Sequence, residues 1–91
     1  MPVFMIERRF AEDFEPSIEG ATDVNRINDE EGVRWLYSFW SKDKRKTFCL
    51  YEAESADAIR RAAERAGLPA DVVIEVSHRI SARGQLQPIT A

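Results

Sequence analysis

The hydrophobic pattern is unusual between Gly32 and Ala53, because both alternating registers of this stretch are apolar. The apolar residues of its first half are Val33, Trp35, Tyr37 and Phe39 in one register and Leu36 and Trp40 in the other. A strand that is apolar on both faces must be covered on both faces. We therefore predict two strands, Val33 to Ser41 and Thr47 to Ala53, joined by the charged turn 42–46.

The other elements follow from periodicity and from helix start and stop signals. Val3 to Phe10 predicts a first strand and Val72 to Ile80 a last one. A helix is predicted from Ile18, after the N-cap Ser17, to Gly32. A second and clearer helix runs from Ser55 to Ala66 and ends at Gly67. The tail 81–91 is expected either to dock along a sheet edge through Leu86 and Ile89 or to be disordered.

This order of elements is the split βαβ arrangement, which predicts an α+β fold of the ferredoxin-like type. Its four-stranded antiparallel sheet carries two helices on one face, and a further C-terminal strand is a possible addition. The predicted domain covers residues 1–80, and residues 81–91 form a tail or an edge strand. Both helices share one face because β–α–β crossovers are right-handed, so the other face is left open.

Alternation assigns the strand residues to two faces, although a shift by one residue would exchange them. The helix-covered face is expected to hold Phe4, Ile6, Leu36, Cys49, Tyr51, Ile74 and Val76. The open face is expected to hold Val3, Met5, Glu7, Arg9, Trp35, Tyr37, Phe39, Phe48, Leu50, Glu52, Val73 and Glu75. An open face this aromatic needs a cover. We expect a homodimer that packs sheet to sheet.

Composition limits the function classes. The chain has 91 residues and a net charge of -3, without a long block of either sign, so it has no general attraction to nucleic acid or to anionic membranes. An RNA-binding sheet is also disfavoured, since the glycines of that signature are missing and carboxylates lie on the open face. One cysteine cannot form an intramolecular disulfide, and no signal peptide or membrane helix is recognisable. We expect a cytoplasmic protein.

Two carboxylates and a phenol are the candidate chemical groups of the open face. We expect Glu7 and Glu52 at the same end of it, on parallel neighbouring strands, with Tyr37 opposite Glu52. Such carboxylates could bind a divalent cation or take part in acid–base chemistry. The alternative is a structural ion pair with Arg9 or with Arg34 of a second copy.

Two further residues could act as metal ligands. His78 is placed near the end of the last strand, on the helix side, and Cys49 lies in the middle of its strand. A lone histidine is more often an ordinary strand-end residue, and a lone mid-strand cysteine a small core residue. No spaced zinc motif or phosphate-binding loop is present.

Four motifs carry a family resemblance: FxxER from Phe4, WxxSF from Trp35, CxYEA from Cys49 and AGLPAD from Ala66. Together they resemble the domain-of-unknown-function 4242 family of small ferredoxin-like proteins, which includes a nickel-binding protein. The resemblance implies the fold, a dimer and the binding or sequestering of Ni²⁺. Many members resembling this pattern have a histidine in the second helix where this chain has Ala62, so one favoured nickel donor is missing.

Three functions remain open from the sequence. The first is a dimer that binds Ni²⁺ or a similar cation through Glu7, Glu52, His78 and Cys49. The second is a small-molecule carrier or cofactor-independent enzyme of the dimeric α/β barrel type, with Tyr37, Glu52 or Glu7 as proton-transfer groups in a pocket between sheets. The third is a structural module that recruits another protein.

Overall fold

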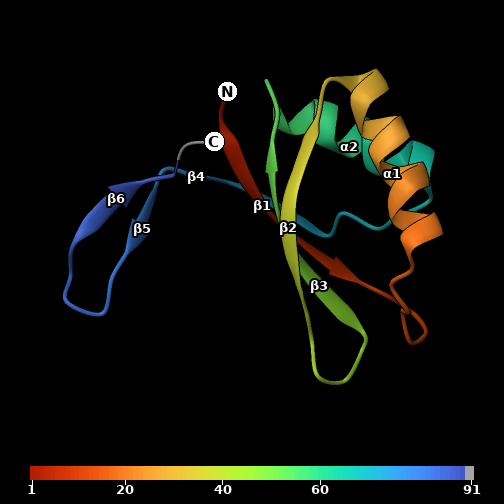
Figure 1. The fold of residues 1–91 in the computed structure, drawn as a ribbon, viewed down its shortest axis with the longest axis horizontal. Helices are drawn as coiled ribbons and strands as arrows, with labels where there is room; N and C mark the ends of the chain where they lie inside the picture. Colours follow the sequence, from red (N-terminus) through yellow and green to blue (C-terminus); the bar gives the residue numbers. More distant parts are fainter. Residues whose placement is uncertain (90–91) are drawn as a thin grey trace.

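Two helices cover one face of a four-stranded antiparallel sheet in the computed structural model, which describes residues 1–89 (Figure 1). The elements are β1 (Val3–Arg9), α1 (Ile18–Glu31), β2 (Arg34–Trp40), β3 (Lys46–Glu52), α2 (Ala56–Ala66), β4 (Val72–Val76), β5 (His78–Ile80) and β6 (Leu86–Pro88). The strand order of the main sheet is β2-β3-β1-β4, and β5 and β6 form a separate pair. The predicted ferredoxin-like α+β fold, with an added C-terminal element, is confirmed.

Both helices begin and end at the predicted residues. The hydroxyls of Ser17 and Ser55 accept hydrogen bonds from the first turns of α1 and α2. Gly32 and Gly67 end the helices in the left-handed conformation, at φ of 71° and 69°, which residues with a Cβ adopt only at a cost. Within residues 1–89, neither helix has the length and apolar character needed to cross a membrane.

The core lies between the helices and the even residues of β1. Ile6 and Ile59 are its largest fully buried side chains, one from the centre of the sheet and one from α2. Around them pack Phe4, Ile27, Val33, Cys49, Tyr51, Ala53, Ala58 and Ala62. The small residues of α2 let this helix lie close to the sheet, so the core is dense on the α2 side.

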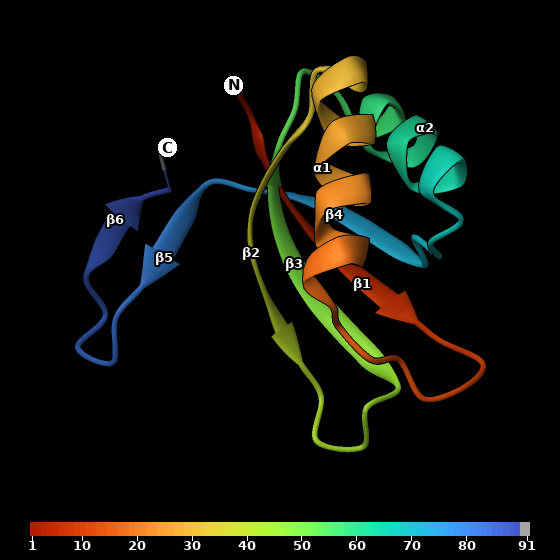
Figure 2. The ribbon, with the colours of Figure 1, turned by 45° about the vertical axis from the view of Figure 1, so that its right-hand side comes forward.

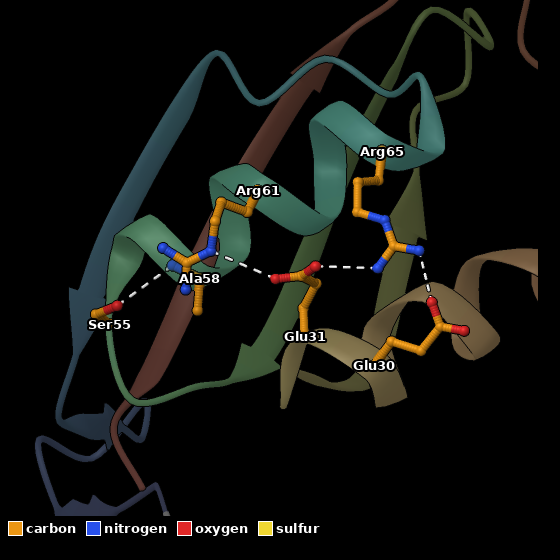
Figure 3. A network of polar contacts seen from close by, with 6 residues as sticks. All are labelled: Glu30, Glu31, Ser55, Ala58, Arg61 and Arg65. Carbon is orange, nitrogen blue, oxygen red and sulfur yellow. Dashed lines mark hydrogen bonds and ion pairs between the residues drawn. The ribbon is translucent and has the colours of Figure 1, made fainter.

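Ion pairs fasten the end of α1 to α2 (Figure 3). Arg65 donates to Glu30 at 2.5 Å and to Glu31 at 3.0 Å, and Arg61 donates to Glu31 at 3.3 Å. The hydrogen bonds from Arg65 lower the pKa of both carboxyl groups. The start of α1 has no such attachment: Ile18, its first residue, is 88% exposed.

A β-bulge in β2 overturns part of the predicted face assignment. Trp35 lies opposite Tyr51 and packs against the core, whereas the register shifts before Tyr37, which lies opposite Leu50. Trp35 is therefore on the helix side and Leu36 on the open side, the reverse of our expectation. Tyr37 is on the open side, as predicted. A bulge adds one residue to a strand, so strict alternation fails beyond it.

The face assignment of β4 is also wrong. Val73 lies opposite Ile6 and packs against the core, while Ile74 lies opposite Met5 on the open side. Residues 72–74 are all apolar, so alternation could not choose the face, and pairing with β1 decides it. The strand is also shorter than predicted, because it ends at Val76.

The C-terminal residues form a hairpin that we call the arm, residues 77–89, which extends from the sheet on the side away from the helices (Figures 1 and 2). The Ile89 amide donates to the Ser77 carbonyl at 3.0 Å and closes its base. His78 lies in β5 and is exposed, rather than at the end of β4 on the helix side as expected. Leu86 pairs with Ile80 within the arm, so it does not dock on an edge of the main sheet. The tail predicted over 81–91 is thus part of a hairpin as far as Ile89, and residues 90–91 lie outside the described part of the chain.

Replacing Ile59 with alanine tests the core. The change removes a fully buried side chain and leaves a cavity, so we expect a loss of about 2–5 kcal/mol in the free energy of unfolding. Ile18→Ala, at the exposed start of α1, should change it by no more than about 0.5 kcal/mol. Urea unfolding followed by circular dichroism measures both, and equal losses would show that the core is not centred on α2.

Candidate functional site

A cavity of about 470 Å³ lies on the helix side of the sheet, beside α1. Its lining comes from the end of β1, the loop before α1, the first three turns of α1, strands β2 and β3, and the end of α2 with the loop after it. The residues that matter below are Arg8, Phe14, Ala21, Trp35, Cys49 and Tyr51. The cavity is thus a site that the open-face prediction did not include.

The cavity exists because α1 is packed unevenly. Ile27 and Asn28, near its end, are buried, and the following residues Glu30 and Glu31 are tied to α2. Towards its start, Gly20 and Ala21 face the cavity with little or no side chain. The helix therefore stands over the sheet at this end without filling the space below it.

Arg8 is the only basic residue that lines this cavity among the described residues, and it is 4% exposed. Its Nη1 donates to the Pro69 carbonyl at 2.6 Å, and Nη2 donates to the Tyr51 hydroxyl at 3.4 Å. The guanidinium carbon lies 5.6 Å from the centre of the Tyr51 ring, a cation–π distance. Within residues 1–89 no carboxylate lies within 4 Å of this buried cation.

Aromatic rings form much of the wall. Trp35 stacks on Tyr51 with ring centres 6.3 Å apart, and Phe10 stacks on Phe14 at 4.5 Å. The Trp35 indole donates to the Ser38 hydroxyl at 2.8 Å, which fixes the ring. Burial raises the pKa of Tyr51 above its ordinary value of 10.0, although the nearby charge of Arg8 acts in the opposite direction. The phenol is therefore neutral in the physiological range.

The two candidate carboxylates of the open face lie apart. β1 and β3 are antiparallel, so Glu52 lies opposite Val3 and Glu7 lies opposite Phe48. Our expectation of parallel strands with both carboxylates at one end is wrong, because neighbours in this sheet run in opposite directions. Tyr37 lies opposite Leu50, so its expected place opposite Glu52 is wrong as well.

Each of these carboxylates is paired with an arginine of its own chain. Arg9 Nε donates to Glu7 at 2.5 Å, and Arg34 Nη1 lies 3.4 Å from a Glu52 oxygen. The Glu7 pair matches the structural alternative weighed from the sequence. Arg34 pairs within one chain, and no second copy is needed for it.

His78 and Cys49 are far from each other in the fold. His78 is exposed on the arm, with Nδ1 3.0 Å from the Ser77 hydroxyl. Cys49 is a buried free thiol on the helix side, where it lines the cavity. Among residues 1–89, no group of three or more His, Cys, Asp and Glu side chains is placed to hold a metal ion. The four predicted metal ligands therefore do not form a site within one chain.

A second, smaller cavity of about 360 Å³ lies on the open side, between the sheet and the base of the arm. It is lined by Met5, Leu36, Tyr37, Leu50, Arg79, Pro88 and Ile89. A cavity near Tyr37 thus exists, but neither Glu7 nor Glu52 lines it. The acid–base group that we expected from the sequence is not assembled there.

Sequence reasoning missed Arg8. It follows Glu7 and precedes Arg9, so the segment resembles a polar strand end. The signal was present in the even register of β1, because Phe4 and Ile6 were already assigned to the covered face. The same alternation places Arg8 under the helices, where an arginine is rarely found without a reason.

The raised pKa of Tyr51 predicts an alkaline loss of stability. A phenol with a higher pKa in the folded state keeps its proton longer than in the unfolded chain, so its contribution is complete below the unfolded pKa near 10 and declines above it. Urea unfolding at a series of pH values from 8 to 11 should show this decline in the wild type. Tyr51→Phe should flatten it, and parallel curves for both proteins would contradict the assignment.

Comparison with known proteins places this fold in a family. A family model described as "Nickel responsive protein SCO4226-like" matches residues 4–76. The crystal structure of SCO4226 from Streptomyces coelicolor A3(2) is similar, with a TM-score of 0.64 and 26% identity over 81% of this chain and 94% of that one. No curated protein matches the chain. The chain therefore belongs to the SCO4226-like family of nickel-responsive proteins.

Proposed function

We propose that the protein is a homodimer, formed through the open sheet face and the arm, that binds Ni²⁺ with donors from both copies. The observation that carries the dimer is the apolar surface on the side away from the helices. Phe39 is 62% exposed, and Tyr37 and Ile74 are at least half exposed on the same side. Several large apolar side chains exposed on one face are typical of protein interfaces.

The arm supports the same partner. Ile80 is 73% exposed and Leu86 is similarly exposed, so the apolar pair of the arm has no cover in its own chain. An isolated two-stranded hairpin is marginally stable in water. A second copy facing the sheet would cover both the open face and the arm, because they lie on the same side of the molecule (Figure 2).

The metal part of the proposal rests on the nickel-responsive family and on the position of the single histidine. Imidazole is a favoured ligand of Ni²⁺, and His78 is exposed on the arm. The donors within one chain do not fit a nickel site, since no cluster of three forms among residues 1–89. Two copies would contribute two imidazoles, with Glu7 as a further oxygen donor on the open face. Cys49 lies on the other side of the sheet and takes no part.

Placing a charge on the open face tests the dimer. Ile74→Glu buries a carboxylate without a partner in the proposed interface, so we expect the dimer dissociation constant to rise at least about tenfold, or ~1.4 kcal/mol. Ile18→Glu makes the same change at an isoleucine that is also exposed but lies on α1, so it is the control and should leave the dissociation constant unchanged. Sedimentation equilibrium measures both. A wild-type monomer at high micromolar concentration would refute the proposal.

Removing the imidazole tests the metal site. His78→Ala should weaken Ni²⁺ binding at least about tenfold, or ~1.4 kcal/mol, in isothermal titration of the tag-free protein. Gln85→Ala, also on the arm, is the control. Equal affinities for His78→Ala and the wild type would place any nickel elsewhere, and no binding by the wild type would reject the metal part while leaving the dimer to its own test.

A further inference from the structure

We propose that the cavity beside α1 binds a small monocarboxylate with a flat apolar body, whose carboxylate pairs with Arg8. This site is separate from the proposed dimer interface, because it lies on the helix side of the sheet. It also needs no metal. The inference concerns a second activity of the chain, the binding of an organic acid.

The charge of Arg8 is the first argument. A buried cation is costly unless it is paired and fully hydrogen-bonded. The Arg8 guanidinium has two protein acceptors, the Pro69 carbonyl at 2.6 Å and the Tyr51 hydroxyl at 3.4 Å. No carboxylate among residues 1–89 lies close enough to neutralise it. A guanidinium has five N–H donors and matches a carboxylate in a two-pronged geometry. The missing counter-ion is thus of the kind that an organic acid supplies.

The cavity walls are the second argument. Trp35, Tyr51 and Phe14 present ring surface, and Val24 and Ile27 add aliphatic surface from α1. The volume of about 470 Å³ falls within the range of roughly 300–1,000 Å³ usual for small-molecule sites. Flat apolar groups bury well against such rings. A cavity with one buried charged group and mostly apolar walls favours a ligand with one charged group and an apolar body.

The rim limits the charge of the ligand. Glu15 and Asp23 are exposed residues of the lining, on the loop before α1 and on α1 itself. Their negative charge disfavours a second anionic group at the mouth, as in a dicarboxylate or a nucleotide. The Ser17 hydroxyl, also in the lining, is occupied by the Gly20 amide at 2.9 Å. One carboxylate at the buried end and an uncharged body towards the mouth satisfy both ends of the cavity.

Three probes of one shape test the charge requirement: indole-3-acetate, its neutral amide indole-3-acetamide, and the cationic amine tryptamine. Isothermal titration of the tag-free wild type should give a dissociation constant below about 1 mM for the acid and values at least tenfold higher for the amide and the amine. Equal binding of the three probes, or no binding of the acid at 5 mM, would overturn the proposal.

Two variants test the location. Arg8→Gln should weaken binding of indole-3-acetate at least tenfold. The neighbouring Arg9 pairs with Glu7 on the other face of the sheet, so Arg9→Gln is the control and should leave this binding unchanged. Because Arg8→Gln could unfold the protein, Ala21→Phe supplies an independent test. It fills the cavity from α1 without touching Arg8, so it should abolish binding while the circular dichroism melt stays cooperative.

Wild-type affinity in a folded Ala21→Phe or Arg8→Gln variant would overturn the site. The dimer variant Ile74→Glu should bind indole-3-acetate as the wild type does. This keeps the outcome of the ligand test distinct from that of the proposed dimer.

Discussion

The register of β1 against its two neighbours governs the rest of the structure. Ile6 pairs with Cys49 on one side and with Val73 on the other, so a single central strand decides which residues of three strands face the helices. The same register places Arg8 beneath the helices, where its guanidinium donates hydrogen bonds to the Tyr51 hydroxyl and the Pro69 carbonyl. Both the core and the charged end of the cavity therefore follow from one set of backbone pairings.

The sequence predicted the fold well and the faces of its strands only in part. Helix ends were predictable because Ser17, Ser55, Gly32 and Gly67 have local physical roles that no distant contact overrides. The strand faces depend on pairing between distant segments. Alternation assigned β1 and β3 correctly, but it failed at Trp35 because of a bulge, and in β4 because consecutive residues are apolar.

The candidate site was harder to predict for the same reason. Glu7 and Glu52 were predicted to lie close together because their strands were expected to be parallel, whereas the antiparallel pairing of β1 and β3 separates them. Arg8 was hidden within a run of charged residues. Arg8 becomes a candidate binding residue only because it is buried and has no carboxylate partner among residues 1–89, and both are properties of the packed structure. Membership in a nickel-responsive family adds a chemical context, because residues 1–89 of one chain hold no group of three or more His, Cys, Asp and Glu side chains placed for a metal ion.

The bulge at Trp35 has a consequence for how copies of this protein can meet. β2 is an outer strand of the sheet. A regular outer strand has a row of unpaired amides and carbonyls that can hydrogen-bond to a strand of another chain. The shift in register between Trp35 and Tyr37 interrupts that row and increases the local twist. The bulge thereby disfavours the addition of further strands at β2, so this edge of the sheet resists the strand-by-strand aggregation that leads to fibres.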